Sequence, residues 1–163
     1  MKYKKEEYVW LLLRISMAFI FLWPFFDKLF GLGFATTPDK AWIAGNSPTY
    51  GFLAFGTHGP FAGFFQSLAG SAFVDWLFMM GLLLIGLALL LGIFTRLACY
   101  YGSLMLFLMW LALIPPEHNP FLDDHIIYAL ILIGIAITKT RKIYSLESLW
   151  SKLKLVKKYS ILR

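Results

Sequence analysis

The stretch PPEHNPFLDDHIIYALILIGIAIT, residues 115–138, combines a cluster of ionisable residues with a long apolar run. Its uncharged second half, Ile126 to Thr138, has thirteen residues, whereas a membrane-crossing helix needs roughly 17 to 25. Asn119 followed by Pro120 supplies an earlier start, because Asn accepts hydrogen bonds from unpaired amides as an N-cap and Pro suits the first helical position. A helix over 120–138 has nineteen residues, and at about 1.5 Å rise each it spans a hydrocarbon layer of about 30 Å.

The composition places the whole chain in a membrane. Of its 163 residues, 60% are hydrophobic and only 15% charged, and the mean hydropathy of +0.70 is too high for an ordinary soluble domain. The net charge of +6 does not indicate nucleic acid, because the basic residues gather at the chain ends and one short turn without interleaved aromatics. Cys99, the only cysteine, excludes an internal disulfide and a CxxC redox pair.

Three further apolar runs have the length of a crossing: 8–26, 76–94 and 97–114. With 120–138 they predict an all-α fold, an integral membrane four-helix bundle that occupies residues 1–138. Thr95 and Arg96 are expected to form a tight turn between the second and third crossings, and Pro115-Pro116 to end the third.

The segments outside these runs have compositions of their own. Residues 31–60 are rich in Gly, Thr, Ser, Asn and Pro, which predicts a long outer loop after the first helix. Residues 61–68 carry Phe and Leu at helical spacing over too short a length to cross, which predicts an interfacial or re-entrant helix. Residues 139–163 are expected to form a basic amphipathic C-terminal helix on the membrane surface.

The basic residues predict the orientation. Four crossings put both termini on one side, and the ends plus the 95–96 turn hold twelve of the 15 Lys and Arg residues, against Lys28 and Lys40 on the other side. The positive-inside rule therefore predicts a multi-pass protein of the plasma membrane with both termini in the cytoplasm. All three histidines then lie on the outer side.

Asp123, Asp124 and His125 are the leading candidates for chemistry. Neighbouring helical positions lie about 100° apart, so these side chains cannot all point into one pocket. Asp124 shares a helix face with Tyr128, and His125 lies over Ala129. A carboxylate removed from water beside an imidazole can share or relay its proton, which suits a redox change at the membrane surface. The alternative is that the acids complement the helix dipole and the histidine lies at the interface.

Other ionisable residues allow two interpretations each. Glu117 and His118 either close over the same site or are solvated loop residues. No HExxH or comparable spacing accompanies these ligand types, so no metal site is predicted. Arg14, about 9 Å along a helix from Tyr8, either snorkels to lipid phosphates or pairs inside the protein, and Asp27 is grouped with it as a structural or pairing residue.

Three segments together resemble the DoxX/DoxD family of small four-helix membrane proteins. They are LLLRIS at 11–16 running on to Asp27-Lys28-Leu29, AWIAGNSPTYGFL at 41–53, and NPFLDDH at 119–125. The resemblance covers most of residues 8–138. It implies a membrane subunit like that of thiosulfate:quinone oxidoreductase, which passes electrons from thiosulfate to quinone while forming tetrathionate, and which pairs with a second small subunit.

The expected roles follow from the residues and this resemblance together. Asp124 and His125 would handle protons at a quinone ring, and Asp123 would orient them. The quinone, as substrate or bound cofactor, and the anionic substrate would be held by residues at the outer ends: Lys28, Trp42, Asn46, Ser47, His118 and Tyr128. Each has a plain alternative, such as a lipid contact or a surface turn. A rival function is a non-catalytic membrane anchor or assembly subunit of a partner redox enzyme, in a homo- or hetero-oligomer.

Overall fold

The computed structural model describes residues 5–138 and 145–146, and these are helical or in connecting loops, with no strand among them. The long helices are α1 (Lys5–Phe30), α3 (Ala72–Leu91), α4 (Thr95–Ala112) and α5 (Asp124–Ile137). Shorter elements are η1 (Pro38–Lys40), η2 (Trp42–Ala44), the π-helical η3 (Phe52–Gly56) and α2 (Ala62–Gln66). The all-helical prediction is confirmed.

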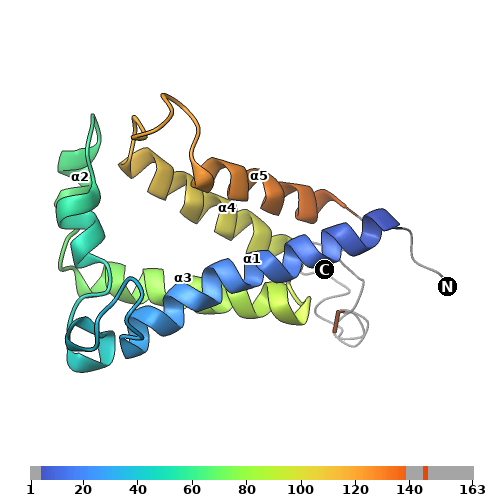
Figure 1. Cartoon of the computed structure of the whole chain (residues 1–163), viewed down its shortest axis with the longest axis horizontal. Helices are drawn as coiled ribbons and strands as arrows, with labels where there is room; N and C mark the ends of the chain where they lie inside the picture. The colour runs from blue at the N-terminus through green and yellow to red at the C-terminus, as the bar shows by residue number, and fades with distance from the viewer. Residues whose placement is uncertain (1–4, 139–144, 147–163) are drawn as a thin grey trace.

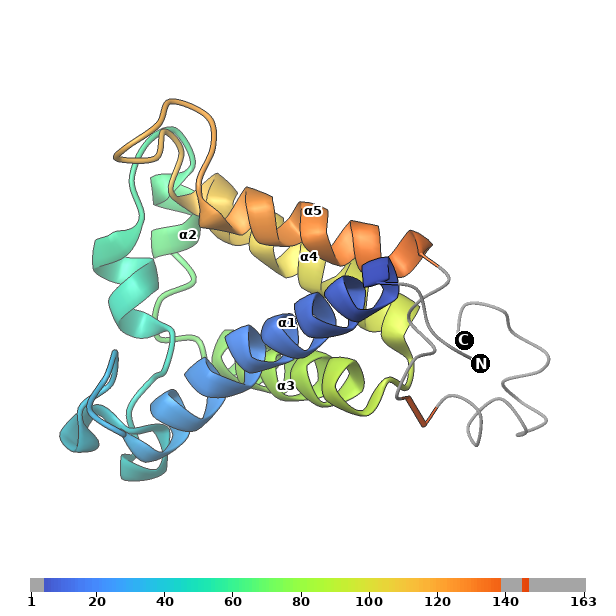
Figure 2. The same cartoon turned by 45° about the vertical axis from the view of Figure 1, so that its right-hand side comes forward.

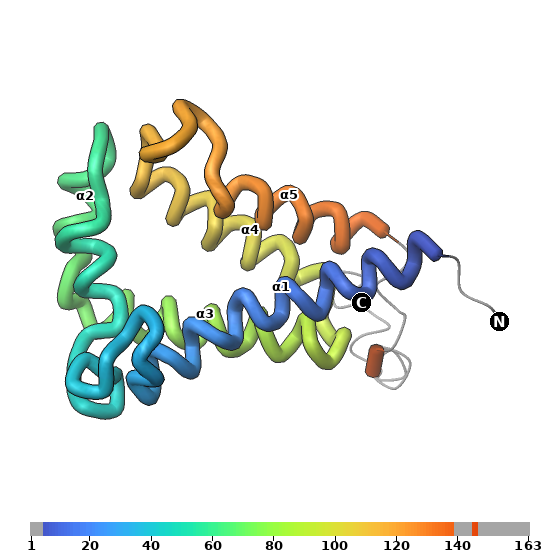
Figure 3. Tube along the Cα trace, viewed as in Figure 1, coloured from blue at the N-terminus to red at the C-terminus, as the bar shows by residue number. Residues whose placement is uncertain are grey.

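The long helices form two pairs. α1 packs along α3, and α4 packs along α5. The pairs converge near the turn between α3 and α4 and splay apart at the opposite end, where α2 and the long connections lie (Figures 1 and 2). After α1 the chain passes through η1 and η2, and η2 packs against the end of α1 (Figure 3). The loops that carry most of the predicted site residues therefore share the splayed end.

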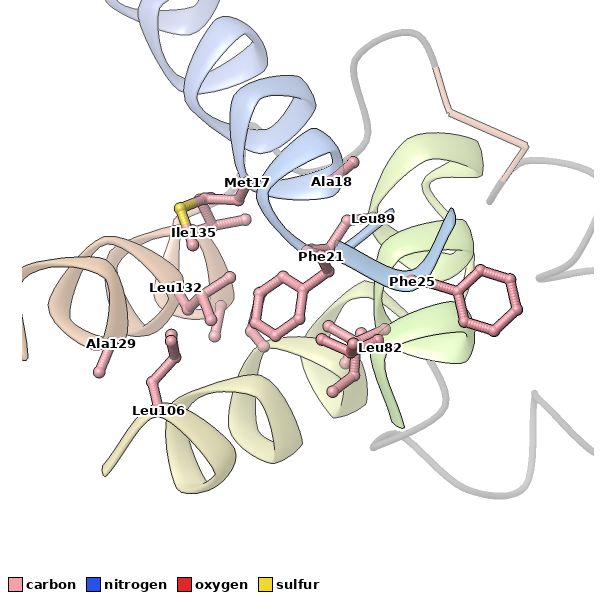
Figure 4. Packing of buried hydrophobic residues seen from close by; sticks show 14 of the residues in the cluster. Met17, Ala18, Phe21, Phe25, Leu82, Leu89, Leu106, Ala129, Leu132 and Ile135 are labelled. Atoms are coloured by element: carbon pink, nitrogen blue, oxygen red, sulfur yellow. The ribbon is translucent and has the colours of Figure 1, made fainter. Parts of the chain in front are cut away.

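The core lies where the four helices meet. Phe21 of α1 lies between Leu132 of α5 and Leu82 of α3 in Figure 4, and all three are buried. Gly102 of α4 faces the same point, because a Cβ there would lie 2.9 Å from Leu132 and 3.1 Å from Phe21. The small residue lets α4 approach the other helices closely.

Three helices, α1, α3 and α4, are long and apolar enough to cross a membrane. The chain is therefore a membrane protein, as predicted. α5 is apolar but has 14 residues, and at about 1.5 Å per residue it reaches about 21 Å of a hydrocarbon layer of about 30 Å. Four crossings stay a prediction.

The predicted start of the fourth helix is wrong. Asp123 is the N-cap of α5, and its Oδ1 accepts from the Ile126 amide at 3.3 Å. Asn119 does accept two amides, those of Phe121 and Leu122 at 2.9 Å each, but it does so in a separate turn. Two cap-forming residues compete in this stretch, and the later one begins the helix.

Other boundaries differ by a few residues. α1 extends past 8–26 at both ends. The predicted turn at Thr95 is wrong, because α3 ends at Leu91 with Gly92 as its C-cap, and Thr95 begins α4 after the N-cap Phe94. Gly92 and Phe94 both have left-handed backbone, with φ of 67° and 50°. α2 confirms a short helix within 61–68.

The predicted C-terminal helix, 139–163, lies outside the described residues except for Ser145 and Leu146. The Leu146 amide donates to the Leu91 carbonyl at the end of α3, at 3.0 Å. That bond ties residue 146 to the converging end of the molecule.

Candidate functional site

A buried carboxylate organises the first part of the connection between α1 and α3. Asp27, in the last turns of α1, is 1% exposed. It accepts hydrogen bonds from the amides of Phe34 at 3.3 Å and Ala35 at 3.0 Å. Because a buried acceptor needs donors, this pairing holds the chain as it leaves α1 and gives Asp27 a structural role.

A second buried carboxylate, Asp75 in the first turn of α3, organises the rest of that connection. Its Oδ1 accepts from the Ser47 hydroxyl at 2.8 Å, and from the Thr49 hydroxyl and amide at 2.5 and 3.3 Å. The Ser47 oxygen in turn accepts from the Tyr50 amide at 3.1 Å. The Ser47 hydroxyl therefore donates its proton to Asp75. The Asn46 side chain similarly donates to the Asp39 carbonyl, at 2.8 Å.

Two residues predicted to bind a ligand, Trp42 and Lys28, lie at the α1–α3 end of the molecule. Trp42 meets Trp76 of α3 edge to face, with ring centroids 4.7 Å apart. Lys28 is partly buried in the last turn of α1, next to Asp27. The binding roles predicted for Lys28 and Trp42 stay predictions.

Two predicted residues lie deeper in the molecule. Arg14 is 2% exposed, and its Nη1 lies 3.1 Å from the position of a Cβ on Gly92, at the turn between α3 and α4. Arg14 is therefore enclosed by protein at the converging end, far along α1 from Asp27. Tyr128 packs against the main core from α5.

A polar depression lies at the N-terminal end of α5 and has a volume of about 410 Å³. Two loops meet there, the one after η3 and the one between α4 and α5, which lie next to each other in Figure 2. Its lining includes all three histidines and three acids: His58, His118, His125, Glu117, Asp123 and Asp124. The structure thus brings together the three predicted catalytic residues and His118.

Asp123 and His125 form the closest polar pair in the depression. His125 Nδ1 lies 2.6 Å from Asp123 Oδ2, while the other oxygen of Asp123 caps α5. Asp123 therefore holds the imidazole against the helix end. With a proton on Nδ1, the neutral ring keeps Nε2 as its proton acceptor. Both side chains are about one-fifth exposed, at 21% and 18%, so water and ligands reach the pair.

His58 comes from the facing loop and has two carbonyl partners. Its Nε2 lies 2.9 Å from the Pro115 oxygen and its Nδ1 3.3 Å from the Gly56 oxygen. Carbonyl oxygens only accept, so both bonds form only when both ring nitrogens carry protons. The Pro115 carbonyl, followed by that of Gly56 and the nearby charge of Glu117, raises the pKa of His58.

The same loop is seated on the end of α4. The His58 amide donates to the Ala112 carbonyl at 3.2 Å. Gly59 has φ +75°, and a Cβ there would lie 1.8 Å from the Ile114 oxygen. Only glycine fits this approach. Because 57 residues separate His58 from Pro115, no local sequence signal indicates that His58 belongs to the depression.

Within residues 5–138 and 145–146, no three His, Cys, Asp or Glu side chains are grouped to hold a metal ion. Comparison with protein-family models, curated proteins and solved structures gives no match to this chain. The depression therefore offers a carboxylate-held imidazole, an exposed carboxylate, and a histidine of raised pKa from the facing loop.

Proposed function

We propose that this chain is a membrane oxidoreductase subunit of the DoxX/DoxD type, which passes electrons from thiosulfate or a related reduced sulfur compound to quinone. The observation that carries the proposal is the Asp123–His125 pair, with Oδ2 and Nδ1 2.6 Å apart, in a depression that holds all three histidines. The depression lies at the end of apolar helices, where a lipid-soluble quinone has access. In this proposal the protein is a multi-pass plasma-membrane protein, its termini are cytoplasmic, and the depression opens outward.

The redox balance explains why such a pair is needed. Two thiosulfate ions lose one electron each and join through a sulfur–sulfur bond to give tetrathionate. The quinone takes up these two electrons and two protons to become the quinol. His125 supplies a proton from Nε2, and Asp123 stabilises the imidazolium before that transfer. Asp124, exposed at the rim, exchanges protons between His125 and water.

The dianionic donor is held at the outer rim. His58 and His118 line this part of the depression, and in their protonated forms they attract an anion that Glu117 and Asp124 would otherwise repel. Lys28 lies at the end of α1, and Asn46 and Ser47 lie in the connection that follows it. For these residues to bind the anion, the anion must approach from that side of the molecule.

The test is thiosulfate-dependent quinone reduction by purified protein in lipid. We expect His125→Ala to lower the rate by on the order of 100-fold, the loss typical of a missing general acid, and Asp124→Asn to lower it less. Tyr101→Phe, on an exposed position of α4, is the matched control and keeps the full rate. If His125→Ala and Asp124→Asn both keep the wild-type rate, the assignment is wrong.

A second candidate is a non-catalytic membrane subunit that assembles a partner redox enzyme. It is favoured by the loop before α5, where Phe121 is 70% and Leu122 52% exposed outside any helix. Apolar side chains at such a rim suit a protein partner, including a second small subunit. Co-purification of a stoichiometric partner, with no quinone in the lipid extract of the complex, would support this candidate against the first.

A further inference from the structure

A second hollow, almost entirely apolar, lies between α4 and α5. It has a volume of about 330 Å³ and is lined by Ser103, Leu104, Phe107, Ile126, Ala129, Leu130 and Ile133. Leu104 and Leu130, on its two sides, are 52% and 58% exposed, so the groove faces outward from the helix pair. Its single hydroxyl, that of Ser103, donates to the Ala129 carbonyl at 3.1 Å, which leaves an apolar surface and ties the helices together.

Along α5 this groove lies next to the polar depression. Ile126, at the top of the groove, directly follows His125, which lines the depression. His125 and Ala129 are four residues apart and therefore lie one turn apart on the same helix face. A ligand against His125 thus lies directly above the groove.

The α4 side shows the same continuity. Phe107 lines the groove, and its ring centroid lies 5.4 Å from that of Trp110, one turn later. The Trp110 indole donates to the Phe121 carbonyl at 2.9 Å, which fixes the loop before α5. Leu113, a further turn along, lines the depression. The groove therefore has α4 and α5 as walls, and the depression begins where α4 ends and α5 starts.

We propose that this groove holds the isoprenoid chain of a quinone whose ring lies in the depression beside His125, an inference that rests on the proposed function. One apolar groove that ends at one polar depression matches a ligand with a single chain and a single uncharged head group. The hydrogen-bonding groups of the depression suit the two ring oxygens, and the groove excludes polar groups. A phospholipid, with two chains and a charged head, matches this shape less well.

The first experiment compares two quinones, one with a long isoprenoid chain and one without a chain. Leu130→Trp fills the groove, and we expect it to lower the ratio of kcat/KM for the long-chain quinone to that for the chainless one by about tenfold, roughly 1.4 kcal/mol. Ile127→Trp, at a 46% exposed neighbouring position outside the groove, is the matched control and keeps the ratio. An unchanged ratio in Leu130→Trp overturns the inference.

A second experiment does not depend on turnover. A quinone with a photoreactive group on its chain is cross-linked to the full-length protein in vesicles, and the labelled peptides are mapped. We expect labelling within 126–133 that an unlabelled long-chain quinone displaces and a phospholipid does not. Labelling elsewhere, or displacement by phospholipid alone, contradicts the inference. If the wild-type protein reduces neither quinone, the proposed function is contradicted instead. The cross-linking map then still shows whether a quinone chain binds in the groove.

Discussion

The two connections at the splayed end of the molecule use their acids in opposite ways (Figure 1). In the α1–α3 connection, Asp27 and Asp75 are 1% and 6% exposed and accept from amides and hydroxyls of the loop they hold. In the α4–α5 connection, Asp124 is exposed. One carboxylate oxygen of Asp123 accepts from the Ile126 amide as the cap of α5, and the other contacts the His125 ring.

The hydrogen-bond partners of a carboxylate decide whether it is available for proton transfer. A carboxylate surrounded by donors within its own loop has its bonding capacity filled by folding. A carboxylate that orients an imidazole at a water-accessible helix end can take part in proton transfer. Asp27 and Asp75 therefore stabilise the α1–α3 connection, whereas Asp123 and Asp124, also close to a helix end, are available for proton transfer.

The largest expected effect is on stability, at Asp75. Asp75→Ala removes the acceptor of three hydrogen bonds and leaves the Thr49 groups buried without it, so we expect a loss on the order of 3 kcal/mol in the free energy of unfolding. Asp75→Asn, which keeps an acceptor oxygen, should lose less. Thermal unfolding in detergent measures both, and equal stability of Asp75→Ala and wild type would contradict the contrast between the connections.

Asp123→Asn tests the acid of the α4–α5 connection. Asn is as good an N-cap as Asp, so the unfolding temperature should change little. The charge that holds the imidazolium of His125 is lost, however, and we expect quinone reduction to slow by about tenfold, roughly 1.4 kcal/mol. Rate and unfolding are measured on the same preparation. A large fall in stability with an unchanged rate would place Asp123 with the structural acids.

The helices were predictable because long apolar runs specify them, and the departures occur where local hydrogen bonds compete. Asn119 and Asp123 both have cap-forming side chains, and the sequence contains no feature that ranks them. The turn after α3 begins at Gly92 and not at the predicted Thr95, because glycine adopts the left-handed backbone conformation at little energetic cost.

The candidate site was predictable where its residues are neighbours in the chain. Asp123, Asp124 and His125 are consecutive in the chain, so predicting a helix start there was enough to place them close together. His58 and Ser47 depend instead on contacts with Pro115 and Asp75, 57 and 28 residues away. The path of a long connection sets such contacts, and residue spacing carries no information about it.

The smallest expected effect, and the finest test of the functional side, is the pH dependence of His58. Its bonds to the Pro115 and Gly56 carbonyls raise its pKa above the ordinary 6.5. A raised pKa in the folded state means that the stabilisation is complete below about pH 6.5 and is lost as the pH rises through the folded-state pKa.

The imidazole signal of His58 in an NMR titration should therefore have its midpoint above 6.5, and its loss in His58→Gln identifies the signal. Because Glu117 faces the ring and contributes to the rise, Glu117→Gln should lower the midpoint slightly while the carbonyl contacts keep it above 6.5. A midpoint at or below 6.5 in the wild type would mean that the carbonyl contacts do not raise the pKa of His58. The difference between the two connections would then rest on the Asp123–His125 pair alone.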